Sequence, residues 1–230
     1  MTTRLHASTR QMIAEIFQAL DYTALASIYC DEGGELFWLD QKGPCQQLGA
    51  KLAIALRPRL QPGGRSLYVG AGVAEIPILV MESMELEREV IACSLRQEEV
   101  TVLNHACQQL PLTFEAADAR SATGHYDHIW MVSVLNDPEQ FPELSALSYG
   151  RANPVTFNPS TFVEERTTVT TLAIDCFNKL ASPGQITCSV EEIPWITHWS
   201  TTFQRPCIID EKDYPTAIVG DPICFITVPD

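Results

Sequence analysis

The residues best suited to chemistry stand in a glycine-bearing turn between an apolar run and a helical pattern, LYVGAGVAEIPI at positions 67–78. Glycines at such a turn let the backbone approach a ligand, and the following helix presents free N–H groups. A dinucleotide site needs G-x-G-x-x-G, but Glu75 stands at the sixth position of the pattern that starts at Gly70. A carboxylate there would repel a pyrophosphate, and the G-K-[ST] of a P-loop is missing. The turn therefore predicts a ligand without phosphates, and an acidic neighbourhood favours a positively charged cofactor.

The charge of the chain narrows the class of partner. The 230 residues carry a formal net charge of −14. Nucleic acids and anionic membranes both require lysine and arginine, so the sequence predicts no nucleic acid and no membrane partner. A small molecule or a protein is the expected substrate. The eight cysteines form no C-x-x-C pair, and no secretory signal or membrane-spanning run is found, which together favour a reducing cytoplasm.

Hydrophobic spacing predicts the elements that position the turn. Strands are expected at 66–69, 89–93, 113–117, 127–135, 185–190, 206–210 and 223–228, and helices at 74–86, 100–110 and 169–180. Alternating strands and helices indicate a doubly wound α/β sheet with parallel pairing. The last two strands have no helix between them, so they are expected to pair antiparallel at one edge. Residues 1–62 are expected to form an N-terminal helical extension, with helices at about 8–20 and 48–60, and residues 136–159 a long irregular loop.

Four segments, in this order, carry a family resemblance: LYVGAGVAE at 67–75, a strand that ends near Ser94, FEAADA at 114–119 and YDHI at 126–129. From about Pro62 to the end, the chain resembles the class I S-adenosylmethionine-dependent methyltransferases. The resemblance implies that residues 63–230 form a Rossmann-like methyltransferase domain. It also implies a mostly parallel seven-stranded sheet with an antiparallel C-terminal strand pair, S-adenosylmethionine as the cofactor, and methyl transfer as the activity.

The resemblance further implies which residues contact the cofactor. They follow the ends of four strands: Gly70, Ala71, Gly72, Ser94, Leu95, Asp118, Ala119, Ser133 and Val134. The glycines would border the methionine part, and Ser94 would stand at the ribose. Asp118 would accept a hydrogen bond from the adenine amino group. The last two residues would lie beside the methyl donor.

Three positions depart from the family pattern. Tyr68 replaces an acidic residue, Ala74 replaces the third glycine of the turn, and Ser94 replaces a carboxylate that would hold the ribose hydroxyls. One hydroxyl cannot make the charged bidentate contact that a carboxylate makes with a diol. Ser94 also has a structural explanation, since Ser94 and Gln97 could form a capping box, and Asp118 could cap a turn. An alternative therefore stays open: a catalytically inactive methyltransferase-fold protein that serves as a binding or interaction module.

Methyl transfer depends chiefly on positioning, and a general base is needed only when the acceptor must lose a proton. The candidate bases follow strand ends: Asp137 after the fourth strand and His198, in PWITHW, after the fifth. The ordinary pKa of histidine lies near working pH. The competing interpretation is that Trp195 and Trp199 pack and His198 is a surface or hydrogen-bonded residue.

The sequence thus predicts a cytoplasmic S-adenosylmethionine-dependent methyltransferase that acts on a small molecule. The N-terminal helices and the 136–159 loop would cover the pocket, which Tyr149 could help to shape. His125 and His128 fall on one face of a strand without a third ligand, so no metal site is expected. A homo-oligomer is compatible with the sequence.

Overall fold

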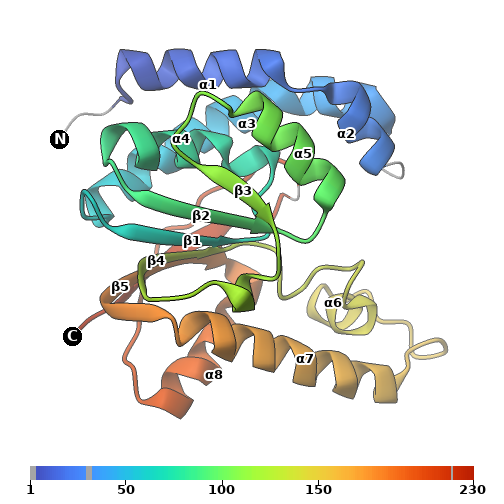
Figure 1. Cartoon of the computed structure of the whole chain (residues 1–230). Helices are drawn as coiled ribbons and strands as arrows, with labels where there is room; N and C mark the ends of the chain where they lie inside the picture. Colours follow the sequence, from blue (N-terminus) through green and yellow to red (C-terminus); the bar gives the residue numbers. More distant parts are fainter. Residues whose placement is uncertain (1–3, 30–32, 219) are drawn as a thin grey trace.

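The computed structural model describes residues 4–29, 33–218 and 220–230. Within these residues one seven-stranded sheet runs through the molecule in the order β3-β2-β1-β4-β5-β7-β6 (Figure 1). The strands are β1 Arg65–Val69, β2 Glu89–Ser94, β3 Thr113–Ala116, β4 Tyr126–Met131, β5 Leu180–Ser189, β6 Ile208–Ile209 and β7 Ile223–Val228. The first five pair in parallel, and β7 is antiparallel to both β5 and β6. The doubly wound, mostly parallel sheet with an antiparallel C-terminal pair is confirmed.

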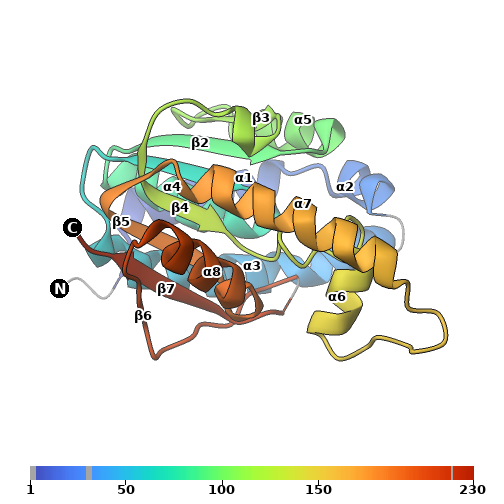
Figure 2. The same cartoon turned by 90° about the horizontal axis from the view of Figure 1, so that it is seen from below.

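Helices cover both faces of the sheet. One face carries α1 Ala7–Ala19, α2 Tyr22–Ile28, α3 Gly34–Leu56, α4 Ile76–Glu85 and α5 Gln97–Ala106 (Figure 1). The other carries α7 Pro159–Phe177 and α8 Ile193–Phe203, while α6 Pro142–Ser148 lies beyond the carboxyl ends of the strands (Figure 2). Among the described helices, none combines the length and the apolar character that spanning a bilayer requires.

The N-terminal helices share a hydrophobic core with the sheet. One apolar cluster joins Phe17 of α1 and Leu56 of α3 to Ile78 of α4 and Tyr68 of β1. A second cluster fills the opposite face, between the sheet and the helices α7 and α8. The helical extension is confirmed, and it packs on the sheet as a continuous layer. The division of the chain at residue 62 stays a prediction.

Several helices differ from the predictions. The helix α2 was not expected, α3 begins at Gly34 instead of residue 48, and the loop at 136–159 contains α6. The helix α7 begins ten residues earlier than the pattern at 169, and α8 was not expected. Pro142, Pro159 and Pro194 each lie in the first turn of a helix. Proline in a first turn favours helix initiation, and Pro142 and Pro159 begin helices within the stretch 136–159 that was expected to be an irregular loop.

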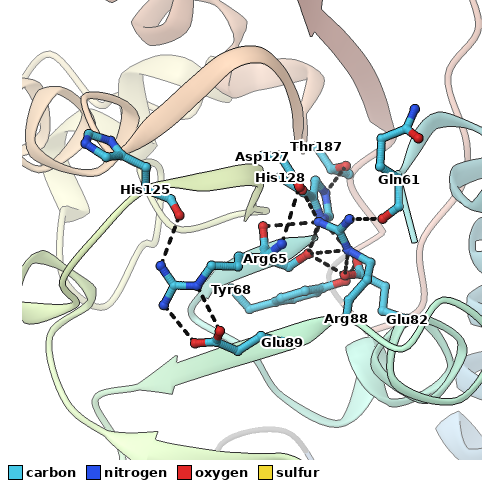
Figure 3. A network of polar contacts seen from close by, with 11 residues as sticks. Gln61, Arg65, Tyr68, Glu82, Arg88, Glu89, His125, Asp127, His128 and Thr187 are labelled. Carbon is cyan, nitrogen blue, oxygen red and sulfur yellow. Dashed lines mark hydrogen bonds and ion pairs between the residues drawn. The ribbon is translucent and has the colours of Figure 1, made fainter. Parts of the chain in front are cut away.

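A buried polar network lies between the sheet and α4 (Figure 3). Glu82 accepts hydrogen bonds from Tyr68 Oη at 2.6 Å and from Arg88 Nε at 3.0 Å, and its Oε1 lies 3.1 Å from His128 Nδ1. Burial alone would raise the pKa of Glu82, but His128 and Arg88 hold that pKa below its ordinary value. Arg88 also pairs with Asp127. Tyr68, at a position where the resemblance implies an acidic residue, thus belongs to this buried network.

Candidate functional site

A cavity of about 560 Å³ opens at the carboxyl ends of β1 to β4. Parallel strands place these ends at one edge of the sheet, where ligands bind in open α/β folds. Eight of the nine predicted cofactor residues line the cavity: Gly70, Gly72, Ser94, Leu95, Asp118, Ala119, Ser133 and Val134. The ninth, Ala71, does not line it but is buried in the apolar cluster beneath the turn. The structure thus gathers the predicted positions around one cavity.

Backbone geometry explains the first glycine of the turn. Gly70 has φ +74°, a backbone conformation that residues with a Cβ atom rarely adopt. A Cβ atom at this position would lie 2.7 Å from Cγ2 of Val134. The N–H groups of Gly70 and Ala71 both donate to the carbonyl oxygen of Cys93, each at 2.9 Å. The turn therefore ties β1 to β2 and leaves room for the segment that follows β4.

Glu75 faces the same cavity from the start of the following helix. Its Oε2 accepts a hydrogen bond from the N–H of Gly72 at 2.9 Å. Burial raises the pKa of Glu75 to about 7, although the N–H of Gly72 opposes the shift. The carboxyl group is thus held close to its titration point near neutral pH, beside the turn.

This shift predicts a pH-dependent stability. The pKa of Glu75 rises from an ordinary 4.5 to about 7 on folding, so the folded state retains a proton that the unfolded state releases between these pH values. The stability of the wild type should therefore fall as pH rises from about 5 to about 8, by on the order of 2 to 3 kcal/mol relative to Glu75→Gln. Urea unfolding of both proteins across this range measures the difference. If the free energies of unfolding of the two proteins changed in parallel with pH, the prediction would be contradicted. The control is Glu98→Gln, because Glu98 is exposed.

Ser94 contacts a second carboxyl group, that of Glu99, which was not among the residues predicted for the site. Its Oγ donates to Oε2 of Glu99 at 3.3 Å and accepts from the N–H of Arg96 at 3.3 Å. The predicted capping box with Gln97 is wrong, because α5 begins after Arg96 and has no side-chain cap. Glu99 is 4% exposed, and its Oε1 would lie 3.1 Å from a Cβ atom on Gly72. A carboxylate is therefore present at the end of β2, supplied from the next helix.

Burial raises the pKa of Glu99, while hydrogen bonds from Tyr29 and Ser94 oppose the shift. Tyr29 follows α2, and the guanidinium of Arg96 lies 4.7 Å from the centre of its ring. Arg96 also forms an ion pair with Glu139, in the segment after β4. Trp38 of α3 lines the cavity as well. Side chains from the N-terminal helices thus line the cavity, and their role as a cover over a bound ligand stays a prediction.

Asp118 caps a turn. Its carboxylate accepts from the N–H of Arg120 at 2.9 Å and forms a bidentate ion pair with the Arg120 side chain. Hydrogen bonds from Arg120 lower the pKa of Asp118. The capping role is therefore observed, and the adenine contact stays a prediction.

The two candidate bases lie in different places. Asp137 lines the cavity, where its oxygens accept from the N–H of Glu139 at 2.9 Å and from Gln140 Nε2 at 3.2 Å. His198 is exposed on α8 and does not line the cavity, while Trp199 beside it is fully buried. The interpretation of His198 as a surface residue between packed tryptophans fits this placement, so Asp137 alone of the two can face a ligand here.

A further acidic group, Asp221, lies outside the cavity lining and contacts two residues of the lining, Ser133 and Tyr149. Ser133 has φ +57°, and its Oγ donates to Oδ2 of Asp221 at 3.2 Å. Tyr149 lines the cavity, and its hydroxyl group donates a hydrogen bond to the same oxygen at 2.5 Å. Asp221 lies in the connection between the last two strands, and no local motif marked it.

Neither a protein-family model nor a curated protein matches the sequence. Solved structures resemble the fold. Magnesium protoporphyrin IX methyltransferase (ChlM) from Synechocystis PCC 6803, solved with bound SAM, is 12% identical with a TM-score of 0.51 over 99% of this chain and 100% of that chain. A methyltransferase from Pyrococcus furiosus is 13% identical with a TM-score of 0.51 over 80% and 83%. The N-methyltransferase NodS from Bradyrhizobium japonicum WM9, in complex with S-adenosyl-L-homocysteine, is 12% identical with a TM-score of 0.51 over 91% and 100%.

Two other matched structures are about twice as long as the aligned region, since the match covers 48% and 49% of their chains. At these identities a structural likeness establishes the fold and leaves activity open. The chain has the fold of the class I S-adenosylmethionine-dependent methyltransferases.

Proposed function

We propose that the protein transfers a methyl group from S-adenosylmethionine to a small-molecule acceptor. The observation that carries the proposal is the cavity at the strand ends, with the glycine turn on one side and, beside it, the carboxyl groups of Glu75, which is part-buried, and Glu99, which is buried. When bound, the cofactor supplies a methyl group on a positively charged sulfonium. Buried carboxyl groups without a neighbouring phosphate site favour such a cation.

The residues present fit this cofactor. Gly70 lets the segment that follows β4 pack against the turn, because a Cβ atom there would meet Val134 Cγ2 at 2.7 Å, and both residues line the cavity. We assign the ribose hydroxyls to Glu99, because a carboxylate forms charge-assisted hydrogen bonds to a diol that Ser94 cannot form. In this assignment Ser94 orients Glu99 through its hydrogen bond of 3.3 Å. Asp118 remains our proposed partner of the adenine amino group.

The acceptor is proposed to be small. The cavity of about 560 Å³ lies within the range of small-molecule sites. The net charge of −14 disfavours phosphate-rich polymers. The cysteines of the described residues are free, which supports our proposal of a reducing, cytoplasmic location.

Calorimetric titration with S-adenosylmethionine and S-adenosylhomocysteine tests the proposal. We expect micromolar binding of both by the wild type, and an affinity loss of roughly 10-fold or more in Gly70→Ala. Gly63→Ala is the matched control, since Gly63 also has a positive φ of +69° but a Cβ atom there would meet nothing within 4 Å. Absence of binding at millimolar cofactor would contradict the proposal and favour an inactive binding module.

A further inference from the structure

Two buried N–H donors in the cavity lack a partner. Asn136 is 2% exposed and Trp38 is 3% exposed, and both residues line the cavity. In the described part of the chain, neither Nδ2 of Asn136 nor Nε1 of Trp38 has a hydrogen-bond partner. The other unpaired buried groups found there belong to residues that do not line the cavity. Unpaired buried donors are costly, so both indicate a ligand that presents oxygen atoms.

The orientation of the Asn136 amide follows from its neighbour. The indole N–H of Trp195 can only donate, and it points to Oδ1 of Asn136 at 3.5 Å. The amide oxygen therefore faces Trp195, which leaves the NH₂ group for the cavity.

Tyr149 presents the opposite chemistry. Its hydroxyl group donates a hydrogen bond to Oδ2 of Asp221 at 2.5 Å. The phenolic oxygen can therefore accept a hydrogen bond from a ligand. Burial and the hydrogen bond to Asp221 raise the pKa of Tyr149. The side-chain hydrogen bonds that Asp221 receives from the described residues come from the neutral hydroxyls of Tyr149 and Ser133. Glu191 lies near enough for the charge of Asp221 to raise its pKa, after burial as the first cause.

We infer that the cavity binds an oxygen-rich small molecule and that a hydroxyl group of this molecule is the methyl acceptor. Asn136 and Trp38 donate to its carbonyl or carboxylate oxygens, and Tyr149 accepts from its hydroxyl. As the acceptor oxygen bonds to the methyl carbon, the bond between that carbon and sulfur breaks and sulfur keeps the electron pair. The hydroxyl proton passes to Tyr149 Oη, and Tyr149 passes its own proton to Asp221. This inference rests on the proposed methyl transfer.

The first test needs no ligand. Asn136→Leu removes the unpaired donor at nearly constant shape and gives up only the long hydrogen bond of 3.5 Å from the part-buried Trp195, so its thermal midpoint should stay close to that of the wild type or exceed it. The matched control is Asn104→Leu, because the Asn104 amide makes two hydrogen bonds to the backbone of Phe114, at 2.9 and 2.8 Å. The control should lose about 4 °C or more. A comparable loss in Asn136→Leu would show that the amide is already satisfied and would overturn its role.

The second test identifies the methylated atom. The wild type is incubated with S-adenosylmethionine labelled with ¹³C on the methyl group and a defined panel of hydroxybenzoates, catechols, aliphatic hydroxy acids, aminobenzoates and primary amines. Carbon NMR then separates O-methyl from N-methyl products. We expect label on oxygen only. Label on nitrogen, or no product from the hydroxyl compounds by an enzyme that binds cofactor, would overturn the inference. Absence of cofactor binding would instead overturn the proposed function.

The third test uses the best acceptor of that panel. Tyr149→Phe and Asp221→Asn should each lower kcat by roughly 10²- to 10⁴-fold, and the double variant should lose little more, because the two residues form one proton path. Asn136→Leu should raise KM by roughly 3- to 10-fold with kcat retained. Cofactor affinity should stay at the wild-type value in all of these variants. Additive losses in the double variant would overturn the proton path.

Discussion

Replacing Arg88 with methionine is expected to lower the free energy of unfolding by about 3 to 5 kcal/mol, because the change leaves a buried carboxylate without its charged partner. The side chains of Arg88 and Glu82 are both fully buried and lie 3.0 Å apart. Arg88 also donates to Asp127 and to Ser66 Oγ (Figure 3). Urea unfolding of the wild type and the variant measures the loss.

Arg65→Met is the matched control for this prediction. Arg65 begins β1 in the same region (Figure 3) and pairs with Glu89 at 2.7 Å, but the two side chains are 35% and 59% exposed. Solvent screens such a pair, so the control should lose no more than about 1 kcal/mol. Equal losses in the two variants would mean that burial does not decide the energetics of the network.

The network also reaches the cavity. Tyr68 belongs to the network and stacks on Trp130, with ring centres 5.4 Å apart, and Trp130 lines the cavity.

Replacing Glu99 with glutamine is expected to weaken the binding of S-adenosylhomocysteine by roughly 10- to 100-fold, because charge-assisted hydrogen bonds to the ribose diol become neutral ones. The fold should be retained, because glutamine has nearly the shape of glutamate and removes a charge whose burial is costly. Glu98→Gln is the matched control, because Glu98 is exposed in the same helical turn. Calorimetry measures both affinities.

A modified ligand separates the diol contact from an indirect effect. The 2′,3′-dideoxy analogue of S-adenosylhomocysteine should lose affinity relative to the parent compound by a larger factor in the wild type than in Glu99→Gln, where only neutral hydrogen bonds to the diol remain. If the analogue loses the same factor in both proteins, Glu99 does not contact the ribose, and our assignment of this residue is wrong.

Much of the architecture could be predicted because it depends on local patterns. Runs of apolar residues bounded by turn signals identified the strands, and the positive φ of +74° at Gly70 agrees with the expected glycine turn. The helices that were missed or placed too late lack such a signal. In α3, Pro44 lies within the helix, where a proline removes a backbone hydrogen bond and disfavours the helix. Tertiary packing against α4 stabilises α3 in spite of this residue.

The candidate site likewise contains residues that the sequence could place and residues that only the packing of the chain places. Gly70, Gly72, Ser94 and Asp118 could be placed from sequence because each follows a strand end, and parallel strands bring their carboxyl ends to one edge. Glu99 lies in the first turn of α5, so its approach to Gly72 depends on where that helix packs. Tyr29 reaches the site from the N-terminal helices, and no spacing along the chain encodes that contact.

By itself the sequence determined the sheet, its parallel and antiparallel parts, and the turn that faces a ligand, since these follow from short-range periodicity and turn chemistry. Only the tertiary structure decided which acidic and hydroxyl groups surround the cavity. Tyr149 and Asp221 are 72 residues apart, and Ser133 and Asp221 are 88 apart. Contacts at such separations arise from packing of the whole chain, because hydrogen bonds between distant side chains leave no periodic signal in the residues around them.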